Sequence, residues 1–262
     1  MNKTSKLIVV TGGSSGIGEA TVQRLARDSA QIIIGDIDEA RGQAVAGGLR
    51  DQGCKATFVR VDLSNEVDIS RFAENILQNH GIPDVLVNSA GLLQNAVHVL
   101  DMDIAEFDRL HAVNVRGTLL ISRALAGPMC EAGRGCIVNL CSLTSFFPSA
   151  QVGYATGKAS LKMLTEIMAA DWGPNGVRVN AVAPGYTLTP AMQARINSGE
   201  RDPDAVIAKT PLGRFVEPQE VAETIAFLCS PAASAITGAT LPIDCGWLVG
   251  AAYRAFASQP KV

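Results

Sequence analysis

The chain has few aromatic residues and no sign of a protein held together by disulfides or metal. Aromatic side chains make up 5% of its 262 residues and hydrophobic ones 47%, so small and aliphatic side chains must fill the core. Its six cysteines form no Cys-x-x-Cys pair and no cysteine–histidine cluster with zinc spacing. We interpret them as reduced, mostly buried thiols and predict no metal site. A chain of this length buries roughly 70–75% of its unfolded surface, enough to fold without cross-links.

The chain also lacks charge runs and long apolar segments. It carries 22 basic and 25 acidic residues, a net charge of −3, and no lysine-rich run, which argues against nucleic acid as a partner. The N-terminus has no signal-peptide pattern. The uncharged stretch 135–157 contains asparagine, serines, threonines and a proline, which is unlike a membrane span. We therefore expect a cytoplasmic protein without a membrane partner.

Short aliphatic segments alternate with segments of helical periodicity. We predict strands at residues 7–10, 31–35, 56–60, 84–88, 136–140, 177–181 and 240–243, and helices at about 16–28, 38–52, 64–79, 104–132, 152–172 and 218–229. The strands lack polar alternation, which indicates a parallel sheet covered on both faces. Right-handed crossovers then predict a Rossmann-type, doubly wound α/β fold in one domain, residues 1–262.

Residues 183–217 interrupt this alternation with four prolines and no predicted strand. A long excursion in a regular fold is usually functional, so we predict a lid over the substrate. The C-terminal tail, residues 248–262, either closes the site or lies along the surface, and the sequence favours neither.

A glycine-rich turn joins the first strand to the first helix. In the run Thr11-Gly-Gly-Ser-Ser-Gly-Ile-Gly18, Gly12 permits the tight turn, while Gly16 and Gly18 let the backbone approach a pyrophosphate. The helix N-terminus supplies free N–H groups and partial positive charge for phosphates. A plain strand–helix turn is the alternative, but the position of the turn favours a dinucleotide site.

Asp36 ends the second strand, where an acidic side chain can accept both ribose hydroxyls of the adenosine half. A carboxylate there repels a 2′-phosphate, and the glycine-rich turn contains no Arg or Lys to offset it. The sequence therefore predicts NAD rather than NADP, although Asp36 could also be an ordinary turn residue. Asp62 and the run Asn88-Ser-Ala-Gly91 follow the next two strands, at the ends where open α/β sheets bind ligands.

Tyr154 and Lys158 stand four residues apart on a predicted helix, so they share one face. A free tyrosine is a poor base because its pKa is near 10. A cation about 4–5 Å away would favour the phenolate and lower that pKa by about 2–3 units. Taken alone, such a pair is usually a partly exposed surface pair.

Together these motifs resemble the short-chain dehydrogenase/reductase family. The matching residues, in order, are Thr11-Gly-x-x-x-Gly-x-Gly18, Asn88-Ser-Ala-Gly91, Asn114, Ser142, Tyr154-x-x-x-Lys158 and Pro184-Gly185. The resemblance runs from about residue 5 to residue 247. It implies a homotetramer built from two long helices, about 106–132 and 152–172, and the last strand.

The resemblance also implies a role for each matching residue. Tyr154 matches the catalytic acid/base, and Lys158 the lysine that lowers its pKa and binds the nicotinamide ribose. Ser142 matches the hydroxyl that orients the substrate oxygen, and Asn114 the asparagine that holds a water in a proton relay. The implied cofactor positions are Gly12, Ser14, Ser15, Gly16, Ile17, Gly18, Asp36, Ile37, Asp62, Leu63, Asn88, Ala90, Gly91, Tyr154, Lys158, Pro184, Gly185, Thr187 and Thr189.

The sequence departs from the family pattern at four places. Ser142 and Tyr154 are twelve positions apart, one fewer than usual, with Ser145 as a further hydroxyl nearby. Asn88-Ser89 replaces Asn-Asn, Thr187 replaces Ile or Val, and Asp244-Cys245-Gly246 replaces Asp-Gly-Gly. None of these changes removes a catalytic group.

The substrate is the least determined part of this interpretation. The candidate residues on the substrate side are Ser142, Leu143, Phe147, Gln151 and Tyr186, and no arginine is evidently placed to clamp a carboxylate. We expect an NAD-dependent oxidoreductase of secondary alcohols and ketones, with a polyol or sugar alcohol favoured. The alternatives are a 3-oxoacyl-thioester reductase, a hydroxysteroid dehydrogenase, and a non-catalytic NAD-binding regulator.

Overall fold

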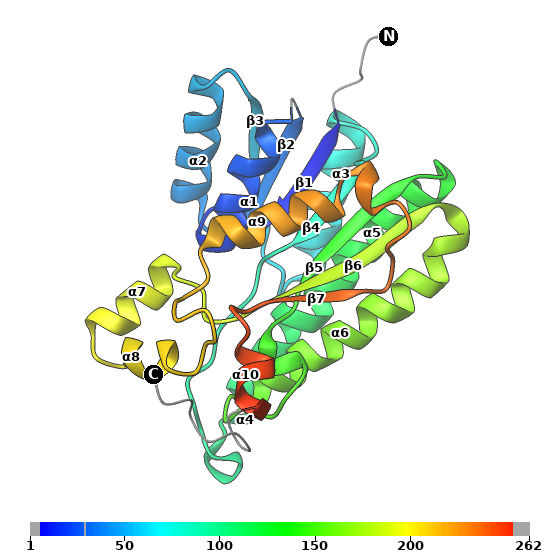
Figure 1. Ribbon diagram of the computed structural model, residues 1–262. Helices are drawn as coiled ribbons and strands as arrows, with labels where there is room; N and C mark the ends of the chain where they lie inside the picture. The colour runs from blue at the N-terminus through cyan, green and yellow to red at the C-terminus, as the bar shows by residue number, and fades with distance from the viewer. Residues whose placement is uncertain (1–5, 29, 254–262) are drawn as a thin grey trace.

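Seven parallel strands form the centre of the molecule. The computed structural model describes residues 6–28 and 30–253. Its strands are β1 (Leu7–Thr11), β2 (Gln31–Asp36), β3 (Lys55–Arg60), β4 (Val85–Asn88), β5 (Gly135–Leu140), β6 (Val177–Pro184) and β7 (Thr240–Ile243). They pair side by side in the order β3-β2-β1-β4-β5-β6-β7 (Figure 1). The predicted doubly wound α/β fold is confirmed.

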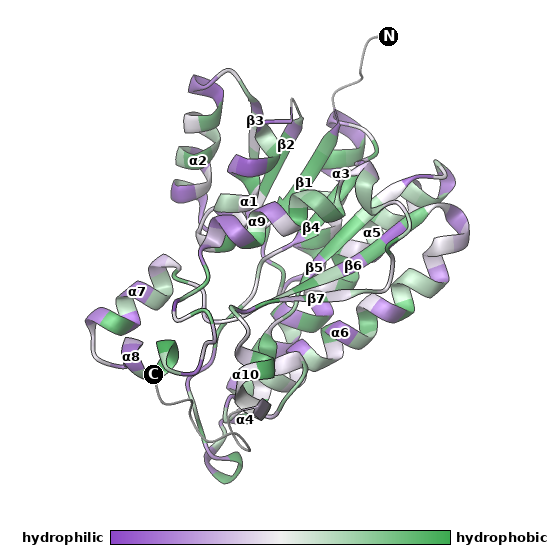
Figure 2. Cartoon of the chain, in the orientation of Figure 1, coloured by the Kyte–Doolittle hydropathy of each residue, from purple (hydrophilic) through white to green (hydrophobic). Residues whose placement is uncertain are grey.

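Helices cover both faces of this sheet. The helices α1 (Gly16–Ala26), α2 (Glu39–Asp51) and α9 (Pro218–Leu228) pack on one face, and α3 (Glu66–Asn79), α5 (Thr118–Glu131) and α6 (Val152–Trp172) pack on the other. The strands are largely hydrophobic while several helices carry polar residues along their lengths (Figure 2). This is the pattern of a sheet buried between two helical layers.

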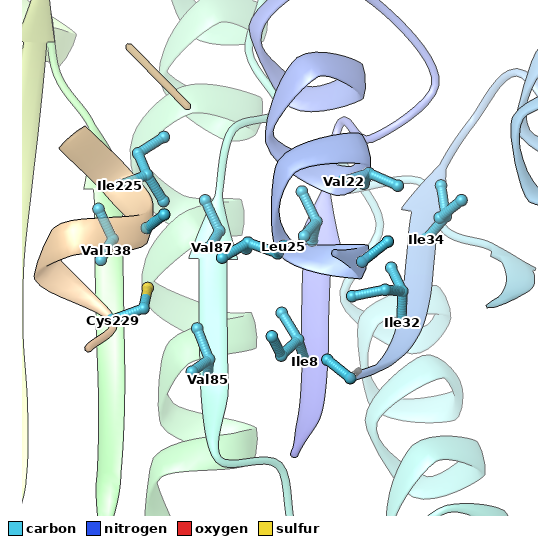
Figure 3. Close-up of a cluster of buried hydrophobic side chains, with 14 of the residues drawn as sticks. Ile8, Val22, Leu25, Ile32, Ile34, Val85, Val87, Val138, Ile225 and Cys229 are labelled. Atoms are coloured by element: carbon cyan, nitrogen blue, oxygen red, sulfur yellow. The ribbon is translucent and has the colours of Figure 1, made fainter. Parts of the chain in front are cut away.

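Successive strand residues point to opposite faces. On β1, Ile8 and Val10 belong to the core under α1, α2 and α9, whereas Leu7 and Val9 belong to the core under α3, α5 and α6. Figure 3 shows the first of these cores, with Val22 and Leu25 of α1 beside the side chains of β1, β2 and β4. Both faces are apolar, so the strands read as unbroken aliphatic runs in the sequence.

The predicted helix at 104–132 is interrupted. It consists of α4 (Ile104–His111), a π-helical turn η2 (Ala112–Gly117) and α5, and the side chain of Asn114 lies buried in the π turn. Single π turns inside α-helices often occur at functional sites. Periodicity did not reveal the break because apolar residues continue through it.

The segment 183–217 leaves the sheet after its first two residues, and Val216 near its end returns to the core under α1, α2 and α9. The prediction that it contains no strand was wrong for its first two residues, because β6 continues through Pro184. Beyond that, Thr187 forms a parallel bridge with Val216, and two short helices, α7 (Pro190–Asn197) and α8 (Pro203–Ile207), project to one side (Figure 1). Each begins with proline, whose fixed φ suits the first helical position.

A left-handed residue precedes the last helix, α10 (Trp247–Tyr253). Cys245 has φ 53° and is the one non-glycine residue with positive φ in the described chain. The family pattern has glycine at this position, and glycine adopts such a φ without steric cost. The departure at Cys245 therefore places a side chain where the backbone favours none. The Asp244 carboxylate stabilises this turn by accepting hydrogen bonds from the backbone N–H groups of Gly246 (2.9 Å) and Leu248 (2.8 Å).

Candidate active site

A cavity of about 530 Å³ opens where the strand order reverses, between β1 and β4. In doubly wound sheets the crevice at this point, beyond the carboxyl ends of the strands, binds the nucleotide. Nine of the predicted cofactor residues line the cavity, namely Gly12, Ser15, Gly16, Ile17, Gly18, Asp36, Ala90, Gly91 and Thr189. The cavity therefore lies where the glycine-rich turn predicted it.

The other predicted cofactor residues do not line this cavity. Ser14, Leu63, Asn88 and Thr187 are buried, Ile37 is 57% exposed, and the Asp62 carboxylate accepts bonds from Ser64, which lower the pKa of Asp62. Lining residues outside the predicted cofactor set are Arg41, Ser89, Leu93, Leu140, Pro190 and Ala191. Arg41 follows Asp36 by only five positions, and this closeness in the sequence is the feature that could have indicated Arg41 as a cofactor residue.

The glycines of this cavity are required by close backbone contacts. A Cβ on Gly18 would lie 1.9 Å from the carbonyl oxygen of Gly12, and a Cβ on Gly12, which has φ +68°, would lie 2.5 Å from the Ala90 nitrogen. Distances this short are impossible for carbon. The turn therefore folds tightly against β4 and leaves the first N–H groups of α1 facing open space, as a phosphate requires. These residues fit a dinucleotide.

Asp36 is held in place by the glycine-rich turn itself. Its Oδ2 accepts hydrogen bonds from the backbone N–H (3.1 Å) and the hydroxyl of Ser14, and its Oδ1 accepts one from the Asp38 N–H (3.2 Å). Ser14 thus positions the carboxylate rather than facing the cavity. Carboxylate oxygens accept more than one bond each, so Asp36 can still receive ribose hydroxyls.

Asn88 belongs to a buried polar network. Its Nδ2 donates to the Ser122 hydroxyl and to Asn139 Oδ1, and each donor–acceptor distance is 2.9 Å. Its Oδ1 has no partner among the described residues. Ser122 and Asn139 lie on α5 and β5, so the network ties β4 to its neighbours. This supports the shape of the crevice from beneath.

A second, smaller cavity of about 160 Å³ adjoins the first, and Leu93 lines both. All five predicted substrate residues, Ser142, Leu143, Phe147, Gln151 and Tyr186, line the smaller cavity, as do Tyr154, Pro184 and Gly185. The structure therefore brings the predicted catalytic hydroxyls and the predicted substrate residues into one space beside the nucleotide cavity.

Tyr154 stands in the first turn of α6, where its backbone N–H donates to Gln94 Oε1 over 3.1 Å. Surrounding protein removes water from the phenol and raises the pKa of Tyr154 above its usual value, and a hydrogen bond with Ser142 acts in the opposite direction. For the protein alone the pKa of Tyr154 is therefore raised rather than lowered as the spacing to Lys158 predicted, because desolvation outweighs the hydrogen bond with Ser142. Desolvation disfavours the charged form of any acid.

Lys158 is 4% exposed, and its Nζ lies 5.6 Å from the Tyr154 ring centroid. The Nζ donates to the Leu140 carbonyl over 2.5 Å, and burial lowers the pKa of Lys158 to about 8. A Cβ added to Gly91 would lie 3.6 Å from this Nζ. Lys158 therefore sits between the phenol and the nucleotide cavity.

Ser142 reaches Tyr154 despite the shortened spacing. Ser142 opens the turn η3 (Leu143–Ser145), and its hydroxyl accepts from the Thr144 N–H over 3.3 Å. Ser145, the additional hydroxyl, donates to the Lys158 carbonyl over 2.8 Å and thereby fastens this turn to α6. Ser145 thus has a positional role, and Ser142 faces the cavity.

Asn114 is fixed by the chain that follows β4. Its Nδ2 donates to the Leu92 carbonyl (2.9 Å), and its Oδ1 accepts from the Leu92 N–H (2.7 Å). These two bonds orient the amide of the π turn toward the segment that lines both cavities.

No arginine is evidently placed in the sequence to clamp a carboxylate, but the structure brings two to the smaller cavity. Arg195 and Arg201, both from the segment 183–217, line the smaller cavity together with Met192. Neither arginine could be recognised from the sequence, because the lid has no periodicity that would say which side chains face inward.

The start of the C-terminal tail touches this cavity. Trp247 stacks on Phe147 with ring centroids 4.6 Å apart and lies 6.2 Å from the Tyr186 ring. Trp247 therefore supports two substrate-side aromatic residues. Residues 254–262 of the tail lie outside the described residues.

Two negative findings apply to the described residues. No three His, Cys, Asp or Glu side chains gather there as a metal site would require. Among the same residues, no helix combines the length and the apolarity needed to cross a bilayer.

Cys141, beside Ser142, is buried, and burial raises the pKa of its thiol to about 11.

Comparison with known proteins identifies the family. A family model described as enoyl-(acyl carrier protein) reductase matches residues 12–248. The chain is 38% identical to cis-4-hydroxycyclohexanecarboxylate dehydrogenase of Sinomonas cyclohexanicum, over 92% of this chain and 96% of that one. It is 36% identical to cyclopentanol dehydrogenase of Comamonas sp. strain NCIMB 9872, with the same coverage.

A solved structure shares the fold closely. The crystal structure of ribose-5-phosphate isomerase from Brucella melitensis 16M is 35% identical, with a TM-score of 0.92 over 98% of both chains. Its name states a different reaction from those of the two dehydrogenases, so we take only its fold as informative. The chain belongs to the short-chain dehydrogenase/reductase family of nicotinamide-dependent oxidoreductases.

Proposed function

We propose that this protein interconverts a secondary alcohol and its ketone, with NAD as the hydride carrier and Tyr154 as the acid/base. One observation carries the proposal: Tyr154 and Ser142 line a small cavity that meets the nucleotide cavity at Leu93, with Lys158 directly behind the phenol. A hydroxyl bound there is within reach of a proton acceptor and close to the nucleotide.

When bound, the nicotinamide accepts or supplies the hydride and, in its oxidised form, adds positive charge near the phenol. In the oxidation direction, the Tyr154 phenolate takes the hydroxyl proton of the substrate. The Ser142 hydroxyl hydrogen-bonds the same substrate oxygen and keeps it at the phenol. Lys158, with a pKa lowered to about 8, is still mostly protonated at neutral pH, so its charge favours the phenolate form. Asn114 serves as the predicted relay toward Lys158.

The cofactor site supports NAD over NADP. Asp36 lines the nucleotide cavity with its carboxylate fixed by Ser14, and a carboxylate there repels a 2′-phosphate while it accepts ribose hydroxyls. Arg41 lines the same cavity and is the one cation there that would favour a phosphate.

The substrate is a small secondary alcohol. The cavity lining combines apolar side chains with hydroxyls and the Gln151 amide, which supports a compact alcohol with some polarity. The names of two relatives, which act on cyclohexane and cyclopentane alcohols, add cyclic alcohols to the polyols that the sequence favoured. The non-catalytic alternative is less well supported, because both Tyr154 and Lys158 are present.

We further propose that the chain works as one dehydrogenase unit in a cytoplasmic homotetramer, with residues 183–217 as its lid. Exposed apolar side chains on α6, Met163 and Ile167, each 55% exposed, suit the helix that the family uses between subunits.

A substrate panel tests this proposal. Cyclic alcohols, polyols, hydroxy acids, hydroxysteroids and acyl thioesters are each mixed with NAD or NADP, and NADH or NADPH formation is followed by absorbance. The ketones and 3-oxoacyl thioesters are tested with the reduced cofactors. We expect turnover of at least one small secondary alcohol with NAD. Tight NADH binding without turnover of any alcohol or ketone would support the non-catalytic regulator.

A further inference from the structure

The substrate cavity carries two positive charges that the proposed reaction does not use. Arg195, in the last turn of α7, and Arg201, in the loop before α8, line it together with Ser142 and Tyr154. The Arg201 N–H donates to the Arg195 carbonyl over 3.0 Å. The two arginines therefore belong to one turn of the lid, and both are half-buried.

No acidic side chain neutralises either of them within residues 6–28 and 30–253, where every ion pair involves other residues. Asp202, next to Arg201, instead caps α8 by accepting from the Asp204 N–H over 3.0 Å. Arg214, near the other end of the same lid, is held by Glu220 through bonds of 2.7 and 2.8 Å. The lid residue Arg214 is thus paired with an acid and does not line the cavity, whereas Arg195 and Arg201 line it without an acidic partner.

Arg201 also has a donor without an acceptor. Its Nε is buried and has no hydrogen-bond partner in the described structure. Its guanidinium carbon lies 5.6 Å from the centroid of the Tyr186 ring, itself a lining residue, and this cation–π contact holds the group at the cavity. A buried N–H without a partner is unfavourable, so a ligand that supplies an acceptor would be stabilised there.

We propose that Arg195 and Arg201 bind an anionic group, a carboxylate, on the substrate whose hydroxyl proton Tyr154 takes. The guanidinium fork matches a carboxylate in two parallel bonds, and Leu143, Phe147 and Met192 add apolar side chains to the lining of the same cavity. This substrate class, a hydroxy acid with an apolar body between its hydroxyl and its carboxylate, rests on the proposed function. It explains why the substrate cavity contains two unpaired cations beside its apolar lining residues.

Matched substrates test the carboxylate directly. The activity of the wild-type protein with NAD is measured on 4-hydroxycyclohexanecarboxylate and on 4-hydroxycyclohexanecarboxamide, which has nearly the same shape without the charge. We expect kcat/KM for the acid to exceed that for the amide by at least about tenfold. In Arg201→Gln and Arg195→Gln the preference for the acid over the amide should fall to about threefold or less. Arg214→Gln is the matched control and should keep the wild-type preference.

Equal use of acid and amide by the wild-type protein would overturn the inference and leave the proposed function standing. An equal loss of both activities in Arg201→Gln would also overturn it, since the arginine would then support the fold rather than the charge. NADH titration and thermal unfolding of each variant show whether the nucleotide site is intact.

Direct binding keeps the inference testable if neither compound is turned over. Calorimetry with the NADH-loaded protein measures binding of cyclohexanecarboxylate, cyclohexanecarboxamide and cyclohexanesulfonate. We expect the carboxylate to bind and Arg201→Gln to lose that binding. Absence of carboxylate binding, or a sulfonate bound about tenfold more tightly, would overturn the assignment to a carboxylate.

Discussion

The two cavities of this protein are built in different ways. The nucleotide cavity is formed mainly by backbone that folds closely at Gly12 and Gly18, with one carboxylate, Asp36, fixed by Ser14. The substrate cavity is formed by side chains from the loop after β5, from α6, from the lid and from the start of α10. Backbone geometry tolerates little change, whereas side chains can be exchanged with limited effect on the rest. The contrast explains how one fold can keep its cofactor and vary its substrate.

The largest effect on cofactor binding should come from a methyl group in the backbone-built cavity. Gly18→Ala would place a carbon 1.9 Å from the Gly12 carbonyl oxygen, so the turn must move away from the phosphate position. We expect NADH affinity to fall by about 100-fold or more, measured by fluorescence titration. Gly48→Ala, where a Cβ meets nothing within 4 Å, is the control. Wild-type affinity in Gly18→Ala would show that the tight turn is not needed.

The buried ammonium group of Lys158, between the two cavities, should make the free energy of unfolding depend on pH. Because burial lowers the pKa of Lys158 from 10.5 to about 8, the unfolded chain binds one more proton than the folded chain between these values. The free energy of unfolding should therefore gain about 3 kcal/mol from this group as pH rises from 8 to 10.5.

Denaturant unfolding at several pH values measures this gain. Lys158→Met should remove the gain and should be the more stable protein below pH 8. Lys162→Met, on the same helix with its Lys162–Glu166 pair partly exposed, should keep the wild-type slope. An unchanged slope in Lys158→Met would contradict the assigned pKa.

A smaller effect should follow from changing the cofactor-selecting carboxylate. Asp36→Ser removes the negative charge and leaves Arg41 in the same cavity. We expect the ratio of NADPH to NADH affinity to rise about tenfold or more. If wild-type NADPH already binds as tightly as NADH, Asp36 does not have the role given to it.

The smallest effect should come from the side-chain-built cavity. Trp247→Leu removes the ring stacked on Phe147, and we expect KM for the alcohol to rise a few-fold with NADH affinity unchanged, since aromatic pairs contribute about 0.5–1.5 kcal/mol beyond area burial. Steady-state kinetics separate the two constants. A parallel loss of NADH affinity would mean that the two cavities are not independent.

The same contrast separates what could be predicted from what could not. The glycine-rich turn, Asp36 and the Tyr154–Lys158 pair were recognisable because backbone constraints and helical spacing leave a local signature. Arg195 and Arg201 had none, since their place depends on how a proline-rich lid returns to the sheet. The π turn at Asn114 and the raised pKa of Tyr154 also depend on packing, on the contact with Leu92 and on desolvation by neighbours distant in sequence.

Hydride transfer by Tyr154→Phe, measured in a single turnover, tests the central claim most directly. The substitution removes one oxygen and leaves the ring, Lys158 and the nucleotide cavity in place. With the best alcohol of the panel and NAD, we predict a rate reduced by at least about 1,000-fold, with NADH affinity within about twofold of wild type. Turnover at the wild-type rate would show that Tyr154 is not the acid/base and would contradict the account.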